Sequence, residues 1–389
     1  MLPRMLTSAA RRGPWRRERL SLPYGDQVPE LAQLLDGKPG RHPPHLSAEP
    51  GRLVDAALHH RVAAYLVRAL RNGSLELPEF DRVRVESATS GSIMHAAVLR
   101  HELANVVAVV GGACDAAPLV VKGPALAEIF YPDRRLRPYF DLDLIVPRDH
   151  LGDATRALEE DGYERLEEFR EGYAERYGHD VHLRRTVANR VVDVELHWRI
   201  GDDPVGLGLS HERLVGDAEL VQIDGAAIDV PGAPAHLLVL AVHLLSDREK
   251  RLCWINDLRL VAASLDDEAW SRAFTLAAEL ELGWPLYRAL DYAEHHLGFE
   301  RARPGLAAPA PAWGPLRAVE ELSLRASPHV GRLAVLGWRE RLAFLRAVLV
   351  PTRAGLVGTV GQDGAATWRL VGRHARQALA GLAPRRDRR

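Results

Sequence analysis

The chain has 389 residues, which is long enough for two or three domains with a sizeable core. Hydrophobic residues make up 47% of the chain and charged residues 26%, a composition typical of an ordinary soluble globular protein. A formal net charge of −1 disfavours general attraction to nucleic acid or to a membrane, and the two cysteines, Cys114 and Cys253, suit a reducing cytoplasm. No apolar run reaches the roughly 18 residues that a bilayer-spanning helix needs.

The first part of the chain is predicted to be helical after an arginine-rich start. Residues 1–28 contain six arginines without a sustained apolar pattern, so we expect a disordered tail. Apolar residues at helical spacing predict short helices within 29–110. A longer helix is expected from Thr89 to about Val110, ended by the pair Gly111–Gly112.

The next stretch is predicted to form a strand, a turn, a helix and a second strand. Leu119–Val121 is bulky and largely β-branched, as a buried strand requires. Gly123 is expected to let the backbone turn sharply beside a ligand, and Pro124 suits the first position of a helix, whose N-terminus attracts phosphate. Asp141 and Asp143 share one face of the second strand, because strand side chains alternate. Their repulsion, roughly 4 kcal/mol at about 4 Å, would be offset by a bound divalent cation.

Lys122 stands out because only three of the 51 basic residues are lysines. A compact ammonium differs from the planar fork of arginine, and phosphate-binding turns often use it as a point charge. Two other interpretations remain open, namely a plain cation at a strand end and a solvated Asp-x-Asp.

Two further strands, joined by a tight connection, are predicted at Asp180–Arg185 and Arg190–Trp198. Asp193, Glu195 and His197 lie on one face of the second strand. This acidic face offers the third carboxylate that a metal site would need, and the outer face of an edge strand is the alternative interpretation.

The remainder is predicted to be mostly helical after a hairpin at Glu219–Val230. In a helix expected at Arg251–Leu260, Trp254 and Asp257 share a face because they are three residues apart. Amphipathic helices are expected to continue toward an arginine-rich C-terminal tail.

Four of these features occur together and in a fixed order. They are Lys122-Gly123, Arg137, Asp141-x-Asp143 and the sequence Glu195-Leu-His-Trp. The segment from about residue 90 to about 265 thereby resembles the family of uncharacterised nucleotidyltransferases within the polymerase-β-type superfamily. Each feature alone is common, whereas the combination is specific.

The resemblance implies an α+β fold with a polymerase-β-like core, in which a small mixed sheet is flanked by helices, and with helical regions at both ends. The expected division of the chain is a tail (1–28), an N-terminal helical region (29–110), the nucleotidyltransferase core (111–232), a helical lid or packing domain (233–300), and C-terminal helices with a basic tail (301–389).

The resemblance also implies roles for particular residues. The implied catalytic residues and metal ligands are Asp141, Asp143 and Glu195, with Asp193 in reserve because relatives more often carry Asp at the position of Glu195. The implied phosphate-binding residues are Lys122, Gly123 and Arg137. Candidate substrate-contacting or lid residues, for which plain packing is the alternative, are His197, Trp254 and Asp257.

The implied reaction is transfer of a nucleotidyl group from an NTP, with ATP expected, to a small-molecule acceptor, with release of pyrophosphate and with Mg²⁺ or Mn²⁺ as cofactor. Two alternatives stay open: an enzyme that modifies a protein side chain with a nucleotide, and an inactive nucleotide-binding protein on the same scaffold. We expect a cytoplasmic protein that acts on neither membranes nor nucleic acid.

Overall fold

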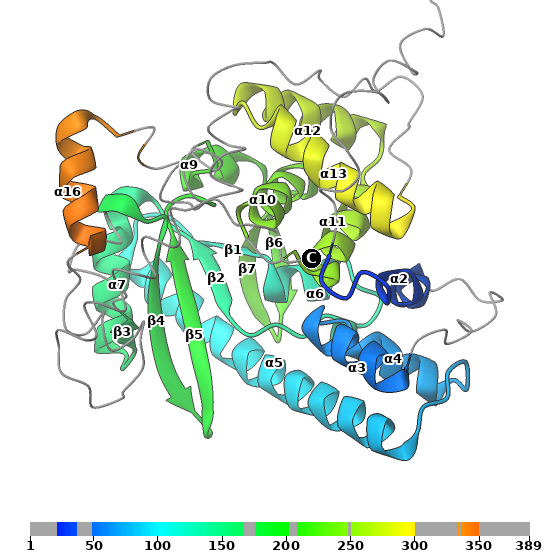
Figure 1. Cartoon of the computed structure of the whole chain (residues 1–389). Coiled ribbons are helices and arrows are strands. Elements are labelled where there is room, and N and C mark those ends of the chain that lie inside the picture. Colours follow the sequence, from blue (N-terminus) through cyan, green and yellow to red (C-terminus); the bar gives the residue numbers. More distant parts are fainter. Residues whose placement is uncertain are drawn as a thin grey trace, which may run out of the picture.

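The computed structural model describes residues 22–36, 49–166, 176–201, 208–247, 250–299, 333 and 336–349. In this part the fold is α+β, as predicted, with a five-stranded mixed sheet, a two-stranded hairpin and helices packed around them (Figure 1). Most of the predicted tail at 1–28 and most of the predicted region 301–389 lie outside the described residues.

The central sheet has the strand order β1-β2-β5-β4-β3. Its strands are β1 (Leu119–Val121), β2 (Leu142–Ile145), β3 (Glu164–Leu166), β4 (Asp180–Val187) and β5 (Arg190–His197). β2 and β5 run parallel, whereas the other neighbouring strands are antiparallel. β4 and β5 are the predicted strand pair, and their connection places Ala188 and Asn189 at positive φ, as a two-residue hairpin turn requires.

β1 separates two hydrophobic cores, because its side chains alternate between the two faces of the sheet. Val120 packs into a core formed with the long helix α5 (Glu79–Ala113) and with α7 (Leu151–Glu160). Leu119 and Val121 instead pack into a second core, which contains the remaining N-terminal helices and the helices that follow residue 232. All three residues are fully buried.

α5 is longer than the helix predicted from the sequence. It begins at Glu79, directly after Pro78, and continues through Gly111 and Gly112 to Ala113, so the prediction that the two glycines end it is wrong. Each glycine is about 0.5–1 kcal/mol less favourable than alanine inside a helix. Burial of the neighbouring Val110 against the sheet offsets this local preference.

α5 is also long and apolar enough, by length and composition, to cross a membrane, which the sequence expectation had excluded for the whole chain. In the structure it lies along the sheet, and 22% of its most apolar stretch is buried. The side chains that it buries there are Leu99, Leu103, Val106 and Val110.

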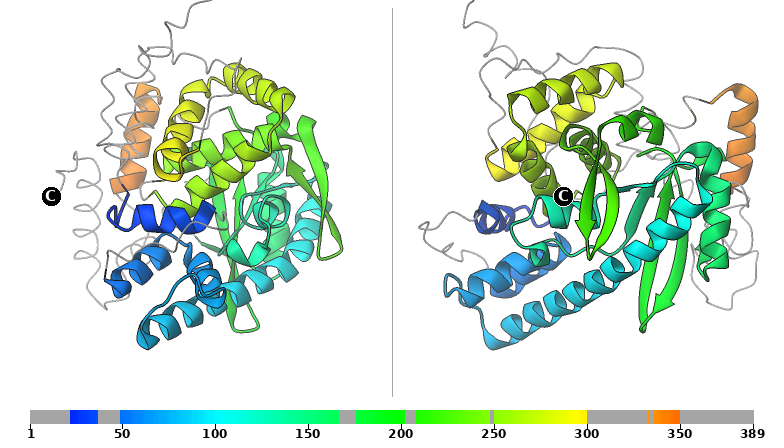
Figure 2. Two further views of the ribbon diagram at one scale, coloured as in Figure 1. Left: turned by 90° about the vertical axis from the view of Figure 1, so that its right-hand side faces the viewer. Right: turned by 180° about the vertical axis from the view of Figure 1, so that it is seen from behind.

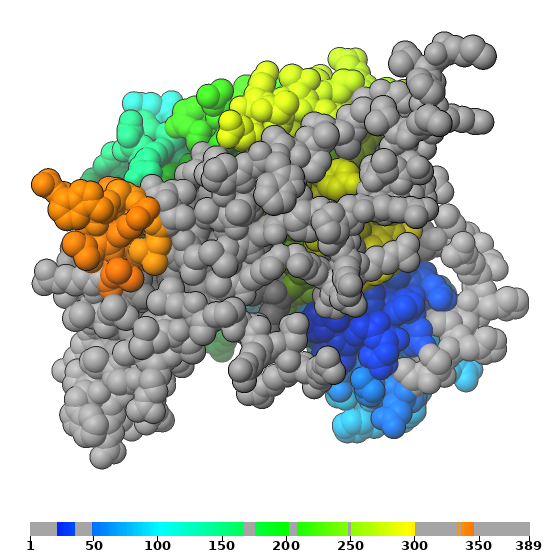
Figure 3. Space-filling model, turned by 45° about the horizontal axis from the view of Figure 1, so that its top comes forward, coloured from blue at the N-terminus to red at the C-terminus, as the bar shows by residue number. Residues whose placement is uncertain are grey.

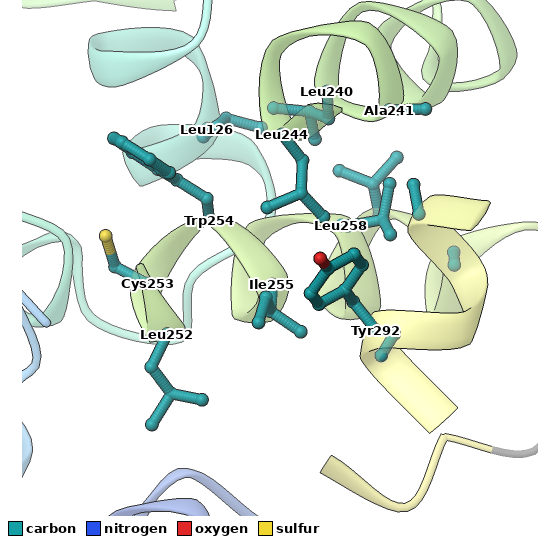
Figure 4. Close-up of a cluster of buried hydrophobic side chains, with 14 of the residues drawn as sticks. Leu126, Leu240, Ala241, Leu244, Leu252, Cys253, Trp254, Ile255, Leu258 and Tyr292 are labelled. Carbon is teal, nitrogen blue, oxygen red and sulfur yellow. The ribbon is translucent and has the colours of Figure 1, made fainter. Parts of the chain in front are cut away.

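The second core is built by helices from both ends of the described chain. The N-terminal ones are α2 (Val28–Asp36), α3 (Pro50–His59) and α4 (Ala63–Arg71), and the later ones are α10 (Ala233–Ser246), α11 (Leu252–Ser264), α12 (Asp267–Glu279) and α13 (Gly283–Leu297). Figure 4 shows side chains of α10, α11 and α13 meeting beside Leu126 of α6 (Gly123–Ile129). The predicted regions 29–110 and 233–300 therefore share a core.

The remaining elements lie around these two cores. The predicted hairpin forms as β6 (Ala218–Ile223) and β7 (Ala226–Pro231), which pairs only with β6 in its own small sheet. Short helical segments are Arg134–Leu136, Arg148–His150, α9 (His211–Leu214) and Val215–Asp217. Seen from behind, α5 runs diagonally in front of the sheet while α10–α13 lie toward the top of the molecule (Figure 2). In the space-filling view, α2–α4 (blue) and α16 (Trp338–Leu349, orange) lie at opposite ends of the visible face (Figure 3).

Candidate active site

Strand register brings three of the predicted residues together. The parallel pairing of β2 with β5 places Asp143 opposite Glu195, and the antiparallel pairing of β1 with β2 places Val121 opposite Asp143. Lys122 follows Val121 directly, and its Nζ lies 2.5 Å from Asp143 Oδ1. Asp143 is only 1% exposed, so this ion pair is buried.

The sequence predicted that Gly123 makes the sharp turn after β1, but in the structure Lys122 makes it. Lys122 has φ 55° and ψ −129°, a conformation that L-residues rarely adopt, whereas Gly123 is the first residue of α6. The Lys122 N–H donates a hydrogen bond to His236 Nε2 at 3.2 Å. Burial lowers the pKa of His236 to about 4, so this imidazole is neutral and can accept the bond at neutral pH.

Gly123 is required for a different reason, namely the close approach of an aromatic ring. A Cβ atom at this position would lie 3.1 Å from both Cβ and Cγ of Tyr139. Tyr139 lines the same cavity as Lys122, so the absence of a side chain at Gly123 lets the ring pack against the start of α6.

His197 binds both paired carboxylates. Its Nε2 donates to Asp143 Oδ1 at 3.0 Å and lies 3.4 Å from Glu195 Oε2. Burial opposes a charged imidazole, but the hydrogen bonds to the two carboxylates raise the pKa of His197 to about 9. His197 is therefore a buried cation at neutral pH, and Lys122 is a second one.

Asp141 lies on the same side of the sheet, one residue before β2 begins. Burial raises the pKa of Asp141 to about 7, and repulsion from Asp143 and Glu195 adds to the increase. The three carboxylates of the cluster can therefore carry more negative charge than Lys122 and His197 neutralise.

These groups line a cavity of about 450 Å³ between the sheet and the helical half of the protein. The carboxylates form one part of its wall, and cationic side chains form another. The cations come from four different segments and are Arg61, Lys122, Arg137 and Arg251. Arg61 has φ 57°, and its guanidinium lies 4.6 Å from the centre of the Phe140 ring.

Two predicted site residues, Arg137 and Asp257, pair with each other inside the protein. Arg137 donates from Nε and Nη2 to the two oxygens of Asp257 at 2.7 and 2.8 Å, and both side chains are buried. Asp257 Oδ1 also accepts a hydrogen bond from the Tyr131 hydroxyl at 2.6 Å. Arg137 thus reaches the cavity from a fixed position, with Asp257 holding its guanidinium.

Trp254, the remaining candidate from α11, lies in the wall of the cavity. Its ring meets that of His243 edge to face, with 4.9 Å between the ring centres. Burial lowers the pKa of His243 well below its ordinary value, so this pair forms an uncharged part of the wall.

The reserve residue Asp193 lies away from the cavity, further toward the turn of the β4–β5 hairpin. Arg184 donates to its two carboxylate oxygens at 2.6 and 3.0 Å. Between the two acidic candidates on β5, the structure thus brings Glu195 level with Asp143 and places Asp193 in an ion pair elsewhere.

Several groups in the described part of the chain have the composition of a metal site. Their ligand atoms lie within 4.8 Å of one another, and the groups are Asp143/Glu195/His197, His179/Asp180/His197 and Asp180/His182/Glu195. Asp141 belongs to none of them, so the predicted ligand set is brought together only in part.

Sequence reasoning missed Arg61, Tyr139 and His182. For His182 a signal existed, because the spacing Asp180-x-His182 in a strand that pairs with β5 puts both side chains on one face. Arg61 gave no local signal, since it lies in the short connection between α3 and α4, far from the cavity residues in sequence.

The chain also matches a known protein family. A family model described as "uncharacterised nucleotidyltransferase" matches residues 47–298. No curated protein matches the chain, and no solved structure does.

Proposed function

Because the chain belongs to the uncharacterised nucleotidyltransferase family, we propose that this nucleotidyltransferase moves a nucleotidyl group from an NTP, with ATP as the expected donor, to an oxygen of a small-molecule acceptor. Pyrophosphate is the second product. The observation that carries the proposal is the alignment of Asp143 with Glu195 across β2 and β5, with Lys122 beside them in the cavity.

The carboxylates suit a hard divalent cation. Asp141, Asp143 and Glu195 offer oxygen ligands, which Mg²⁺ and Mn²⁺ prefer. The three carboxylates can carry more negative charge than the positive charges of the two buried cations neutralise. When bound, such an ion supplies positive charge that neutralises the triphosphate and the leaving pyrophosphate.

The cationic wall supports binding of the triphosphate. Lys122 brings its ammonium to the end of β1, and Arg61 and Arg251 present guanidinium groups to the same cavity. Arg137 adds a charge whose position is set by Asp257. Catalysis then depends mainly on positioning and on charge stabilisation, since nucleotidyl transfer needs little covalent chemistry from the protein.

Glu195 is suited to orient the acceptor. Burial opposes its charge, but His197 and Lys122 hold the pKa of Glu195 below its ordinary value, so the carboxylate stays ionised. An ionised Glu195 accepts a hydrogen bond from the acceptor hydroxyl and directs its oxygen toward the α-phosphorus. A cavity of about 450 Å³ falls within the size range of small-molecule sites, which favours a small acceptor.

Pyrophosphate release tests the reaction. The purified full-length protein is incubated with Mg²⁺ or Mn²⁺, with each common NTP in turn, and with a small-molecule cell extract as the source of acceptors. We expect release with ATP, and transfer of label from ATP labelled at the α-phosphorus to the small-molecule fraction. Label in the protein fraction would favour side-chain modification, and nucleotide binding without release would favour an inactive binding protein.

Paired variants on one strand face test the assignment of Glu195. Glu195→Gln should lower pyrophosphate release by about 10²–10³-fold, because it removes a charge that acts in the transition state. Asp193→Asn, two residues away and paired with Arg184, should lower it by less than about tenfold. The reverse order of the two effects would show that Asp193 is the third carboxylate.

A further inference from the structure

The β4–β5 hairpin carries four metal-ligating side chains on one face, of which the proposed reaction uses only those on β5. The antiparallel register pairs His182 with Glu195 and Asp180 with His197. Because strand side chains alternate, Asp180 and His182 point to the same side of β4, toward their partners on β5. The two strands are adjacent in the sheet (Figure 1), so this square of side chains has a rigid backbone.

Three of the four side chains already lie close to the spacing that a bound ion requires. His182 Nε2 donates to Asp180 Oδ2 at 2.9 Å, and His182 Nδ1 lies 3.7 Å from Glu195 Oε1. Around a tetrahedral ion with bonds of about 2.0–2.1 Å, neighbouring ligand atoms lie about 3.3 Å apart. His182 reaches the two carboxylates through different ring nitrogens, so its ring must turn to bring one nitrogen to an ion that all three side chains share; one ligand atom from each of the three already lies within 4.8 Å of the others.

The ligand chemistry differs from that of the proposed catalytic ion. Imidazole nitrogen combined with carboxylate oxygen suits Zn²⁺ and its neighbours in the first transition row, whereas Mg²⁺ prefers oxygen ligands alone. The side chain of His182 is 40% exposed, so an ion can enter from solvent. His179, whose Nε2 lies 3.7 Å from Asp180 Oδ2, belongs to a separate group with Asp180 and His197.

We propose that Asp180, His182 and Glu195 form a second metal site, selective for Zn²⁺-like ions, and that its occupation inhibits the enzyme. The inhibitory part rests on the proposed function, because it follows from the sharing of Glu195. Glu195 Oε1 faces His182, while Oε2 faces His197 and, through it, Asp143. A carboxylate bound to an ion on the His182 side is withdrawn from the acceptor, so zinc slows nucleotidyl transfer.

The sharing also predicts how the two kinds of ion influence each other. If Glu195 serves both sites, then each ion must weaken the binding of the other by the same factor. Raising the Mg²⁺ concentration in the presence of nucleotide therefore relieves inhibition by Zn²⁺.

Cobalt binding tests the site without any nucleotide. Co²⁺ is titrated into the metal-free full-length protein and followed by its visible absorption and by calorimetry. We expect one equivalent to bind with the spectrum of a nitrogen- and oxygen-ligated ion. His182→Ala should weaken binding at least about tenfold, while His101→Ala, a control at an exposed position on α5, should leave it unchanged. Thermal melts of the metal-free variants establish that they are folded, and His182→Gln provides a second variant.

Inhibition is measured separately by pyrophosphate release in Mg²⁺ with added Zn²⁺. Wild type and His101→Ala should be inhibited, whereas His182→Ala, compared with its own rate in the absence of Zn²⁺, should resist Zn²⁺. Equal Co²⁺ affinity in wild type and His182→Ala, or no binding to wild type, overturns the site. If Co²⁺ binds at the site but Zn²⁺ inhibits wild type and His182→Ala equally, the proposal that the two sites share Glu195 is wrong. If the protein did not catalyse nucleotidyl transfer, the cobalt titration would still test the metal site. A failure of the proposed function can therefore be distinguished from a failure of the proposed site.

Discussion

Lys122 neutralises part of the buried carboxylate cluster from within the protein. Burial opposes the charge of its ammonium, but Asp143, Glu195 and Asp141 hold the pKa of Lys122 above its ordinary value. Asp143 therefore already has a cation 2.5 Å away when no metal is bound. A bare divalent ion must compete with this ammonium, which weakens its binding in the absence of nucleotide.

Lys122→Met should have opposite effects on metal binding and on turnover. Removing the Lys122 ammonium takes away the positive charge that opposes a cation at the carboxylates. In the absence of nucleotide, Mg²⁺ should therefore bind at least about tenfold more tightly. Pyrophosphate release should fall because the phosphates lose a contact. Calorimetry of Mg²⁺ binding checks the first effect, with Arg156→Met on the exposed face of α7 as a charge-matched control. Unchanged Mg²⁺ affinity would contradict the role of the ammonium as counter-ion.

Asp141 should make the stability of the metal-free protein depend on pH. Because burial raises the pKa of Asp141 to about 7 from an ordinary value of 3.8, the folded state binds its proton more tightly than the unfolded state. The stabilisation from this proton is fully present below about pH 4 and is lost as the pH rises through about 7.

Asp141→Asn should remove that dependence. In a chelating buffer at pH 8 the variant should melt about 2 °C or more above wild type, and the difference should vanish toward pH 4. Thermal melts across this range measure the effect, and Asp193→Asn, whose carboxylate pairs with Arg184, should follow the wild-type profile. A variant that melts well below wild type at every pH would show that Asp141 is structural.

Among the secondary-structure elements, α5 shows how tertiary packing overrides local preference. Gly111 and Gly112 would end an isolated helix, but both lie inside α5, which ends at Ala113. A Cβ atom at Gly112 would have no neighbour within 4 Å, and the residue has no positive φ. The glycine is thus tolerated at this position without being required.

Gly112→Ala should stabilise the protein by about 0.5–1 kcal/mol, because alanine loses less backbone entropy in a helix. Denaturant unfolding measures the change in the free energy of unfolding. The matched control is Gly123→Ala, whose Cβ would come 3.1 Å from Tyr139 and which should destabilise the protein instead. If both variants were destabilised, the end of α5 would be held by glycine-specific geometry.

Local patterns predicted the strands well, and the contacts between distant residues less well. The alternation around Asp141 and Asp143, and the two strands that became β4 and β5, follow from short-range periodicity. The pairing of Asp143 with Glu195 spans more than fifty residues, and only the family pattern indicated it in advance. Arg61 could not be predicted, because its place in the cavity depends on the packing of α3 and α4 and leaves no trace in the neighbouring sequence.

On the scale of the whole molecule, the ion pair of Arg137 and Asp257 joins the sheet half to the helical half. Arg137 lies just before β2, and Asp257 lies in α11. Asn256, next to Asp257, adds hydrogen bonds to the hydroxyls of Tyr65 and Tyr131 at 3.2 and 3.1 Å. This buried polar network reaches from α4 to α11 and keeps the cavity wall in place.

Asp257→Asn should destabilise the protein by about 3–5 kcal/mol, because it leaves the buried guanidinium of Arg137 without a charged partner. The double variant Arg137→Met/Asp257→Leu should be destabilised by less than the sum of the single changes. Unfolding free energies of Arg137→Met, Asp257→Leu and the double variant give the coupling energy. Asp193→Asn, which breaks an exposed pair, should cost less than about 1 kcal/mol, and a similar loss for Asp257→Asn would contradict the network.

β1 also determines how the molecule comes apart on heating. Its three residues serve two cores at once, with Val120 in one and Leu119 and Val121 in the other. If one half unfolded alone, the apolar side chains of β1 on that side would become exposed to water, which is unfavourable. We therefore expect the described halves to unfold as a single calorimetric unit, and a fragment cut at residue 232 to aggregate when it is expressed without the helices that follow.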